Sequence, residues 1–240
     1  MDDAPSSPST EAKDLESAPF EAIRFTPEQQ RHVQLMRGIA RSITASTRDN
    51  FVLKGGTALL LAYGLPRYSE DLDFDGKRSS VDLTAGIHAG AQQVGVTVDQ
   101  LTTKKNTATT RRHMLHHGGD TAAPLKIEVS YRQSEDIDEA DVTTVDGIRV
   151  YKLEKLAELK VAAMVNRTAA RDIFDVAFLL DRYPAAISDA SLREVEGLID
   201  RLGLDDLEAI MRHDRILQSH DLAHVAVALV DGVAALRSQR

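Results

Sequence analysis

The chain has 240 residues, a net charge of −8 and 42% hydrophobic residues, which is enough apolar material for one large domain or two small ones. It contains no cysteine, which excludes a disulfide framework and thiolate chemistry. No apolar run approaches the ~18 residues that a membrane span needs, so we expect a soluble, cytoplasmic protein. The acidic balance argues against indiscriminate nucleic-acid binding but leaves room for a local basic surface.

The first 19 residues are acidic and rich in serine and proline. They carry too little apolar surface to offset the entropy of ordering, and they lack the basic start and apolar middle of a signal peptide. We therefore predict a disordered leader over residues 1–19. A change of pattern near residue 150 predicts two further units, an α/β domain over 20–150 and a helical domain over 151–240 that contributes to the cleft of the site.

Local signals place the elements in chain order. Thr26, Pro27 and Gln29 supply an N-cap, a first-turn proline and a capping box, so a helix begins there. Strands are predicted over 50–53, 69–76, 108–117 and 125–132, and helices over 57–64 and 81–96. From about Tyr151 onward the pattern is helical only. Strands alternating with helices, followed by a helical block, indicate an α/β domain with a helical C-terminal domain.

One short segment combines a glycine turn with a pair of carboxylates. A strand that turns through Gly55 and Gly56 into a helix presents free backbone N–H groups, which suit a phosphate, and the Thr57 hydroxyl adds a donor. Asp71 and Asp73 lie two residues apart on an extended chain, so both point to one face. Adjacent ionised carboxylates repel each other unless a cation joins them, and Mg²⁺ completed by water and phosphate oxygens fits that role. The segment therefore predicts a site for a nucleoside triphosphate.

Glu128 is a candidate third acid. It lies on the polar face of the strand predicted over 125–132, and it joins the carboxylates if that strand pairs beside the one that carries Asp73. It then serves as a metal ligand or as the base for the attacking hydroxyl. The alternative, a polar residue on a solvated sheet face, is equally compatible with the pattern.

The helical block contains charged residues where apolar ones are expected. Lys160 lies within the apolar arc of the helix that begins near Leu153, and Arg167 follows on nearly the same line. Because an unpaired buried ammonium is costly, Lys160 must meet an anion or reach water, and we favour a triphosphate in the cleft between the domains. In the next helix, Asp172 sits at the margin of the core face, whereas Asp175 is expected on the polar side.

Residues 104–117 form a basic island without an acid: Lys104, Lys105, Arg111, Arg112, His113, His116 and His117. Such an island could grip the phosphates of an RNA with salt-dependent affinity. The alternative is a basic hairpin held by the surrounding acidic surface. The histidines do not predict a zinc site. Neither His113, His116 and His117 nor the pair His220 and His224 is accompanied by a further ligand at metal spacing or by a cysteine.

The glycine turn and D-x-D, with thirteen residues between Thr57 and Asp71, form the signature of the polymerase-β nucleotidyltransferase superfamily. The core R-x-S-x-D-L-D-F is distinctive. Together with LKIEVSY and LAELKVAAMVNRTAARDIFDVAFLL, these residues resemble the bacterial AbiEii/AbiGii-type nucleotidyltransferase toxins, which include the mycobacterial MenT proteins, over residues 27–182.

The resemblance implies a polymerase-β-like nucleotidyltransferase domain with a mixed sheet, followed by an α-helical domain. It implies Mg²⁺-dependent transfer of NMP from an NTP, CTP being favoured among the best-known relatives, to the 3′ end of tRNA. Such transfer blocks aminoacylation and translation and halts growth. The implied partners are tRNA or another RNA and a cognate antitoxin protein, with no DNA and no membrane.

The resemblance also assigns residue roles. It implies metal binding by Asp71 and Asp73 and active-site roles for Lys160 and Asp172, with Glu128 as the further catalytic candidate. The implied nucleotide-binding residues are Gly55, Gly56, Thr57, Arg67, Ser69 and Lys160. The family often reads LAEKL where this chain has LAELK, so Lys155 is a rival for the role of Lys160. A phosphate on Ser69 would repel the substrate, whereas a plain hydrogen bond to the local turn is the alternative.

Two other functions stay open at the level of sequence. One is a nucleotidyltransferase that modifies a protein or a small molecule, by AMP transfer or antibiotic modification, and such an enzyme does not need the basic island. The other is a non-catalytic module that binds RNA or a partner. The intact pair Asp71 and Asp73 argues against the second, because a site without catalysis is free to lose costly acids.

Overall fold

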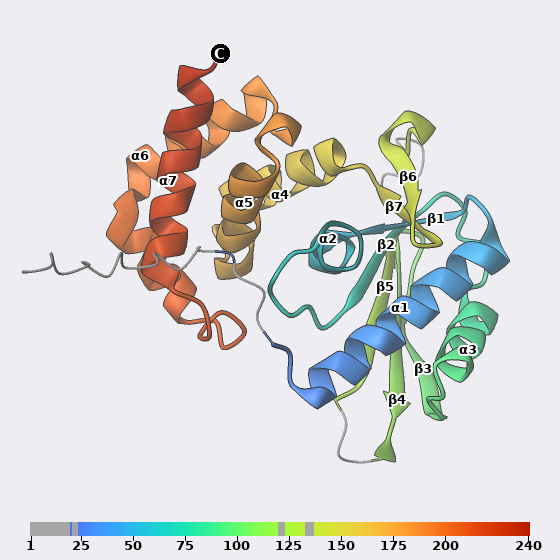
Figure 1. Cartoon of the computed structure of the whole chain (residues 1–240). Coiled ribbons are helices and arrows are strands. Elements are labelled where there is room, and N and C mark those ends of the chain that lie inside the picture. The colour runs from blue at the N-terminus through green and yellow to red at the C-terminus, as the bar shows by residue number, and fades with distance from the viewer. Residues whose placement is uncertain (1–19, 21–23, 120–122, 133–136) are drawn as a thin grey trace, which may run out of the picture.

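The structure, a computed structural model, describes residue 20 and residues 24–119, 123–132 and 137–240 (Figure 1). The leader predicted over residues 1–19 lies outside the described residues. The described chain forms a seven-stranded sheet with helices packed against it, followed by a region that is entirely helical. This arrangement agrees with the fold class expected from the sequence.

The sheet has the strand order β3-β4-β5-β2-β1-β7-β6. Its strands are β1 (Phe51–Lys54), β2 (Leu72–Gly76), β3 (Val98–Asn106), β4 (Thr110–His117), β5 (Leu125–Ser130), β6 (Val142–Val145) and β7 (Ile148–Tyr151). The central strand β2 runs antiparallel to β1 and parallel to β5. The sheet is therefore mixed, and two segments that are distant in sequence meet at its centre.

Helices α1 (Pro27–Thr47) and α3 (Thr84–Gln93) lie together over one face of the sheet, and α2 (Gly55–Tyr63) lies on the other side (Figure 1). The capping box predicted for Thr26 and Gln29 is present at the start of α1. Close packing of α1 on α3 depends on Gly90, because a Cβ there would clash with the Cα of Ile39.

Strand β5 shows how the sequence separates the two faces. Leu125, Ile127 and Val129 are buried beneath the helices, whereas the alternate residues Lys126 and Glu128 are only half-buried. Because side chains alternate along a strand, the second set lies on the opposite face. This polar face carries the candidate site residues Asp73 of β2 and Glu128 of β5.

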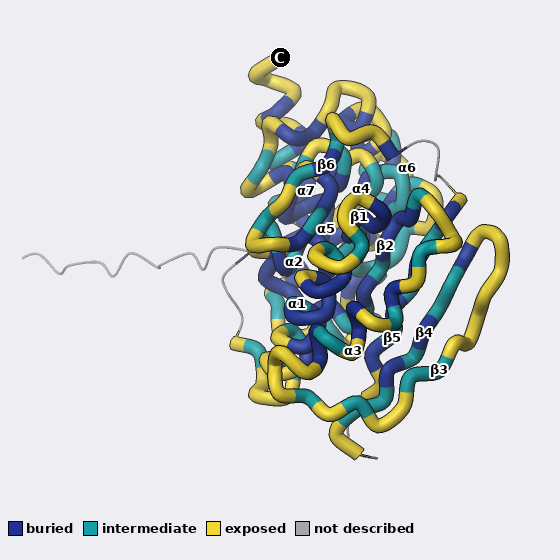
Figure 2. The backbone as a smooth tube through the Cα atoms, turned by 90° about the vertical axis from the view of Figure 1, so that its right-hand side faces the viewer, coloured by how far each residue is buried: buried dark blue, intermediate teal, exposed yellow. Residues whose placement is uncertain are grey.

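The helical region consists of α4 (Leu153–Arg167), α5 (Ala170–Arg182), α6 (Asp189–Arg212) and α7 (Leu222–Ser238). Helix α5 is the centre of this region, and α4, α6 and α7 all pack against it. Figure 2 shows buried backbone in α4 and α5 and long exposed stretches in the β3–β4 hairpin. Phe20 also joins this core, since its ring packs edge-on against Phe174 and Phe178 at centroid distances of 5.4 and 5.8 Å.

The predicted strands over 50–53, 69–76, 108–117 and 125–132 correspond to β1, β2, β4 and β5, with small shifts at their ends. Strands β3, β6 and β7 have no counterpart among the predicted strands. The burial pattern of β3 explains its omission, because all of its residues are at least partly exposed and they show no apolar alternation. The division at 150/151 stays a prediction. In the described part of the chain, no helix combines the length and apolarity that crossing a membrane requires.

Candidate active site

The turn between β1 and α2 brings the glycine pair against the segment that carries the acids. Gly55 has a φ of +77°, a conformation that favours glycine because it has no Cβ. A Cβ on Gly56 would lie 2.6 Å from the Nη2 atom of Arg67. The Thr57 hydroxyl lies 2.7 Å from the Ser69 hydroxyl and is also hydrogen-bonded to the Asp71 carbonyl. The two glycines and Thr57 therefore line one side of a tightly bonded loop.

The sheet register places Asp73 between two charged residues of neighbouring strands. Asp73 lies opposite Lys54 of β1 and opposite Glu128 of β5. The condition set for Glu128 from the sequence is thus met, because β5 does pair beside β2. A Cβ on Gly55 would lie 3.6 Å from the Oδ2 atom of Asp73. The central carboxylate and the glycine turn are therefore direct neighbours.

The acids that surround Asp73 are each paired with a cation. Asp71 contacts Lys126 at 2.7 Å and Glu128 contacts Arg112 at 2.6 Å. Two residues further along β2, Asp75 contacts Lys54 at 2.5 Å. The carboxylate of Asp73 itself has neither an ion pair nor a hydrogen bond within the described chain.

Electrostatics at Asp73 follow from this arrangement. Burial raises the pKa of Asp73 above its usual value, and the negative charges of Asp71 and Glu128 add to that effect. The positive charges of Lys126 and Lys54 oppose it. The charged form of this carboxylate is therefore disfavoured in the free protein, and a bound cation relieves the cost.

The donor set fits Mg²⁺ held by two carboxylates. Among the described residues, no group of three or more histidine, cysteine or acidic side chains has the geometry to hold a metal ion. Glu128 is paired with Arg112 and Asp71 with Lys126, so Asp73 is the carboxylate of this group without an ion pair among the described residues, and Asp71 and Asp73 stay the predicted metal ligands. Mg²⁺ commonly takes one or two protein carboxylates and completes its octahedron with waters and substrate phosphates. The pair therefore suits this ion when a triphosphate supplies the remaining oxygens.

The helical region contributes a buried network of alternating charge. Lys160 of α4 contacts Asp175 at 2.5 Å and Asp172 at 3.5 Å. Asp175 also accepts two hydrogen bonds from Arg67, from Nε at 2.6 Å and from Nη2 at 2.7 Å. Asp172 accepts two from Arg167, at 2.6 and 3.0 Å. The order of the network is Arg67, Asp175, Lys160, Asp172, Arg167, and it joins the loop beside Gly56 to the end of α4.

The interpretation of Asp175 as a residue of the polar side was wrong, because its side chain is wholly buried. Burial alone would raise its pKa, but the charges of Arg67 and Lys160 outweigh that effect and hold the pKa of Asp175 below its usual value. Lys155 instead makes a surface pair with Glu158 at 3.0 Å. Of the two rival lysines, the structure thus brings Lys160 to Asp172.

Arg167 is the residue of this site to which sequence reasoning gave no role. Its side chain is 65% exposed although the Asp172 carboxylate that holds it is 1% exposed. The hydrogen bonds that Arg167 donates to Asp172 chiefly raise the pKa of Arg167, with smaller contributions from the charges of Asp172, Asp175 and Asp73. The signal was available in the sequence, since Arg167 follows Lys160 on nearly the same line of the helix.

The basic island is divided between the two faces of the sheet. Arg111 donates to the backbone carbonyls of Val81 and Ser79 and lies 5.8 Å from the Tyr131 ring centroid. Arg112 points to the opposite face, where it meets Glu128. Lys105 lies opposite Arg112 in the register of β3 and β4, and Lys104 and Lys105 are both exposed. The four cations predicted together are therefore not one surface.

Two of the histidines adopt structural positions. His113 is buried, and its Nδ1 lies 3.2 Å from the Thr103 hydroxyl. The ring of His220 lies 4.5 Å from that of Phe174, and burial lowers the pKa of His220 to about 4. These contacts support core packing for both side chains.

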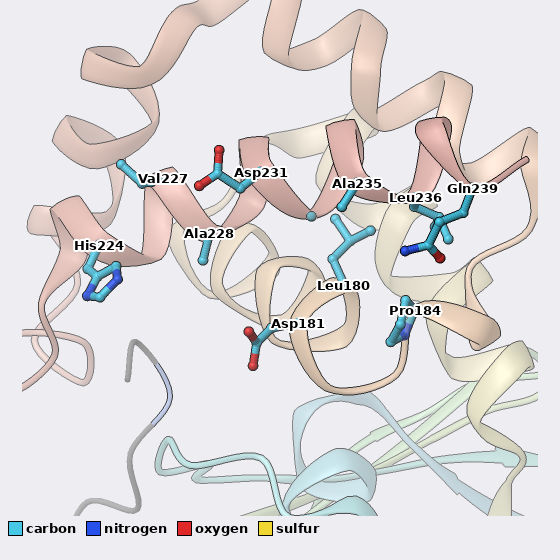
Figure 3. Close-up of a pocket in the computed structure, with 11 residues that line it drawn as sticks. Leu180, Asp181, Pro184, His224, Val227, Ala228, Asp231, Ala235, Leu236 and Gln239 are labelled. Carbon is cyan, nitrogen blue, oxygen red and sulfur yellow. The ribbon is translucent and has the colours of Figure 1, made fainter. Parts of the chain in front are cut away.

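A separate pocket of about 430 Å³ lies between α5 and α7 (Figure 3). Its walls include Leu180, Asp181, His224, Val227 and Asp231. None of the predicted site residues lines it, so it is distinct from the nucleotide site predicted at the glycine turn.

The mixed sheet, the glycine turn and the adjacent carboxylates define a nucleotidyltransferase-like protein. A model of the family described as "Nucleotidyl transferase AbiEii toxin, Type IV TA system" matches residues 39–221. The chain therefore belongs to the AbiEii family of nucleotidyltransferase toxins of type IV toxin–antitoxin systems, and the resemblance recognised in the sequence is confirmed.

Solved structures support the fold. JHP933 from Helicobacter pylori has a TM-score of 0.78 and 27% sequence identity, over 90% of this chain and 94% of that one. A second H. pylori structure, described provisionally as a nucleotidyltransferase, has a TM-score of 0.77 and 27% identity, over 90% and 97% of the two chains. A search among curated proteins found no match.

Proposed function

We propose that this protein transfers NMP from an NTP to the 3′ end of an RNA, with tRNA as the favoured acceptor and Mg²⁺ as the cofactor. One observation carries the proposal: the Asp73 carboxylate lies against the Gly55 turn without a cationic partner among the described residues, while the acids around it are paired. An unpaired carboxylate beside a phosphate-type turn is the arrangement that a metal–triphosphate complex satisfies.

In this proposal Asp71 and Asp73 hold the metal, which supplies charge neutralisation at the attacking oxygen and at the leaving pyrophosphate. The backbone N–H groups at the start of α2 bind phosphate, because they lie at a helix N-terminus. Gly55 and Gly56 allow the phosphate to approach the backbone closely. Thr57 and Ser69 hold the loop in shape through the hydrogen bond between their hydroxyl groups.

The acceptor RNA is proposed to run over the open face of β3, β4 and β5. Arg112 lies on this face beside Glu128, the cross-strand neighbour of Asp73. Lys105 extends the positive charge outward from Arg112. Phosphate contacts of this kind give salt-dependent affinity with little sequence preference. Arg111 lies on the other face and is not part of the proposed track.

The biological role that this reaction supports is growth inhibition by blocked aminoacylation, with a cognate antitoxin as the neutralising partner. CTP is the favoured nucleotide, because the best-known members of the family use pyrimidines. Both points rest on the family and not on a contact in the described chain.

Incubation of the protein with each radiolabelled NTP, Mg²⁺ and total RNA tests the proposal. We expect a labelled band at the size of tRNA that disappears with EDTA and with Asp71→Asn. Label that enters protein or a small molecule from a cell extract, with none in RNA, would replace the RNA acceptor and keep the nucleotidyltransferase. No transfer from any NTP to any of these acceptors would overturn the proposal.

A further inference from the structure

The buried charge network raises the question of which cation meets the triphosphate. Arg67 is 3% exposed, and its Nε and Nη2 are bonded to Asp175 while Nη1 is bonded to the Tyr68 carbonyl. Lys160 is 7% exposed and is shared between Asp172 and Asp175. Both cations are therefore buried and neutralised by carboxylates, so they are less accessible to a substrate than an exposed cation is.

Arg167 differs from these two cations in its exposure. Two of its five N–H groups bond to Asp172, and a guanidinium then has three left for another acceptor. A buried carboxylate fixes the plane of the guanidinium, while almost two-thirds of the side chain stays open to solvent. This combination holds a planar donor in place before a ligand arrives, which lowers the entropic cost of binding.

The position of Arg167 relates it to the metal site. The hydrogen bonds to Asp172 chiefly raise the pKa of Arg167, and the charge of Asp73 adds a small contribution in the same direction. Arg167 is also the end of the network that begins with Arg67 beside Gly56. The chain of ion pairs through Asp172, Lys160 and Asp175 thus connects the guanidinium of Arg167 to the loop beside the glycine turn.

On the basis of the proposed function, we propose that Arg167 binds the β- and γ-phosphates of the NTP, with Asp172 as the positioning residue that holds its guanidinium. Arginine matches phosphate oxygens with two parallel hydrogen bonds. Lys160 and Arg67 then act indirectly, because they fix Asp172 and Asp175 and so the orientation of α5. The class of ligand is defined as a triphosphate, and a nucleoside monophosphate lacks the groups that Arg167 contacts.

Calorimetric titration of the full chain in Mg²⁺ with CTP and with CMP tests this inference, and each of the other NTPs with its NMP is used where CTP does not bind. For Arg167→Ala we expect about 10- to 100-fold weaker binding of the triphosphate and unchanged binding of the monophosphate. Arg167→Lys should recover only part of the loss, since a lysine cannot form the paired bonds. Asp172→Asn should weaken triphosphate binding less than Arg167→Ala, provided that circular dichroism shows an intact fold.

Arg182→Ala is the matched control. Arg182 is also an arginine paired with an aspartate in the helical region, with a side chain 49% exposed, and it lies at the other end of α5 from Asp172. We expect wild-type affinity for this variant. Equal triphosphate affinity in Arg167→Ala and the wild type would overturn the inference, as would an equal loss for triphosphate and monophosphate.

The two proposals fail in different ways. If the wild type binds no NTP in Mg²⁺, the proposed function fails and the role of Arg167 fails with it. If the wild type binds and transfers NMP while Arg167→Ala does so equally well, the role of Arg167 alone is overturned.

Discussion

The acids of the sheet and the acids of α5 are arranged in opposite ways. On the sheet, Asp73 has no ion pair among the described residues, and burial together with its acidic neighbours raises its pKa and disfavours its charge. On α5, Asp175 is fully buried, yet two cations contact it and hold its pKa below the usual value. The Asp73 carboxylate therefore lacks a neutralising cation, whereas the Asp175 carboxylate is contacted by two.

This difference separates binding from positioning. A buried carboxylate that has no neighbouring cation to neutralise it is suited to bind a metal ion from solution. A carboxylate in a satisfied buried network is suited to hold other side chains, and removing one partner leaves a buried charge uncompensated. Mutation of the sheet acids should therefore affect chemistry, whereas mutation of Asp175 should affect stability.

The largest expected effect is on the chemistry at the sheet. Asp71→Asn removes half of the metal-binding pair, so transfer of label to RNA should fall by roughly 10³-fold. The rate is measured with labelled NTP at saturating Mg²⁺. The melting temperature serves as the control and should change little, because Asp71 is partly exposed. Transfer at the wild-type rate would remove Asp71 from the mechanism.

Asp175→Asn tests the buried charge network of α5. It leaves Arg67 and Lys160 without their shared buried charge, and we expect a loss of about 3–5 kcal/mol in the free energy of unfolding. Urea denaturation measures this loss. Asp181→Asn is the control, since Asp181 pairs with Arg182 near the surface and such a pair contributes at most about 1 kcal/mol. Similar losses for the two variants would contradict the distinction between binding and positioning carboxylates.

Gly56→Ala tests how closely the network meets the glycine turn. The added Cβ would lie 2.6 Å from Arg67, and Arg67 cannot move easily because Asp175 holds it. Overpacking of this kind costs about 1–3 kcal/mol, which corresponds to about 2–4 °C in melting temperature for each kcal/mol in a chain of this size. Gly197→Ala is the control, because the nearest atom to its added Cβ is Arg201 Nη1 at 4.0 Å. Its melting temperature should not fall.

Arg112→Ala tests the proposed RNA track. We expect RNA binding to weaken about tenfold near 150 mM salt and the slope of log affinity against log salt to become shallower by about one unit. Filter binding at several salt concentrations measures both. NTP affinity should stay unchanged, and Arg201→Ala, an exposed arginine of α6, should behave like the wild type. An unaltered salt slope for Arg112→Ala would exclude a phosphate contact.

Asp73→Asn has the smallest predicted change in stability, and its direction is the informative result. Removing this disfavoured charge should raise the melting temperature slightly without Mg²⁺, while transfer is lost. The sign follows from the raised pKa: a folded-state pKa above the unfolded value means that stability falls as the group ionises, so the ionised form costs stability at neutral pH. A lower melting temperature measured in EDTA would contradict an unfavourable charge at Asp73.

The sequence was sufficient to predict that the acids Asp71, Asp73 and Glu128 lie on the polar face of the sheet, because spacing along a strand determines which face a side chain occupies. Asp71 and Asp73 lie two residues apart, and Glu128 alternates with buried neighbours, so strand geometry gives their common side. The sequence pattern did not show whether β5 lies beside β2, and the structure shows that the two strands pair in parallel.

The buried network could not be predicted in the same way. A helical wheel shows that Asp175 leaves the apolar arc of its own helix, but it does not show that Arg67 arrives there from a loop 108 residues earlier. The division of Arg111 from Arg112 depended on the register of β4, which requires its partner strands. Strand β3 gave no signal because its mostly exposed residues are not patterned by burial.

The packing around α5 determines which truncated fragments of the protein keep their core. A fragment trimmed to residues 39–221, the span matched by the family model, would lose Phe20 from its place against Phe174 and Phe178. It would also lose α7, where Gly232 lies close enough that a Cβ would be 3.0 Å from Leu180 of α5. The packing of the helix that carries Asp172 and Asp175 therefore depends on residues outside the span that the family model matches.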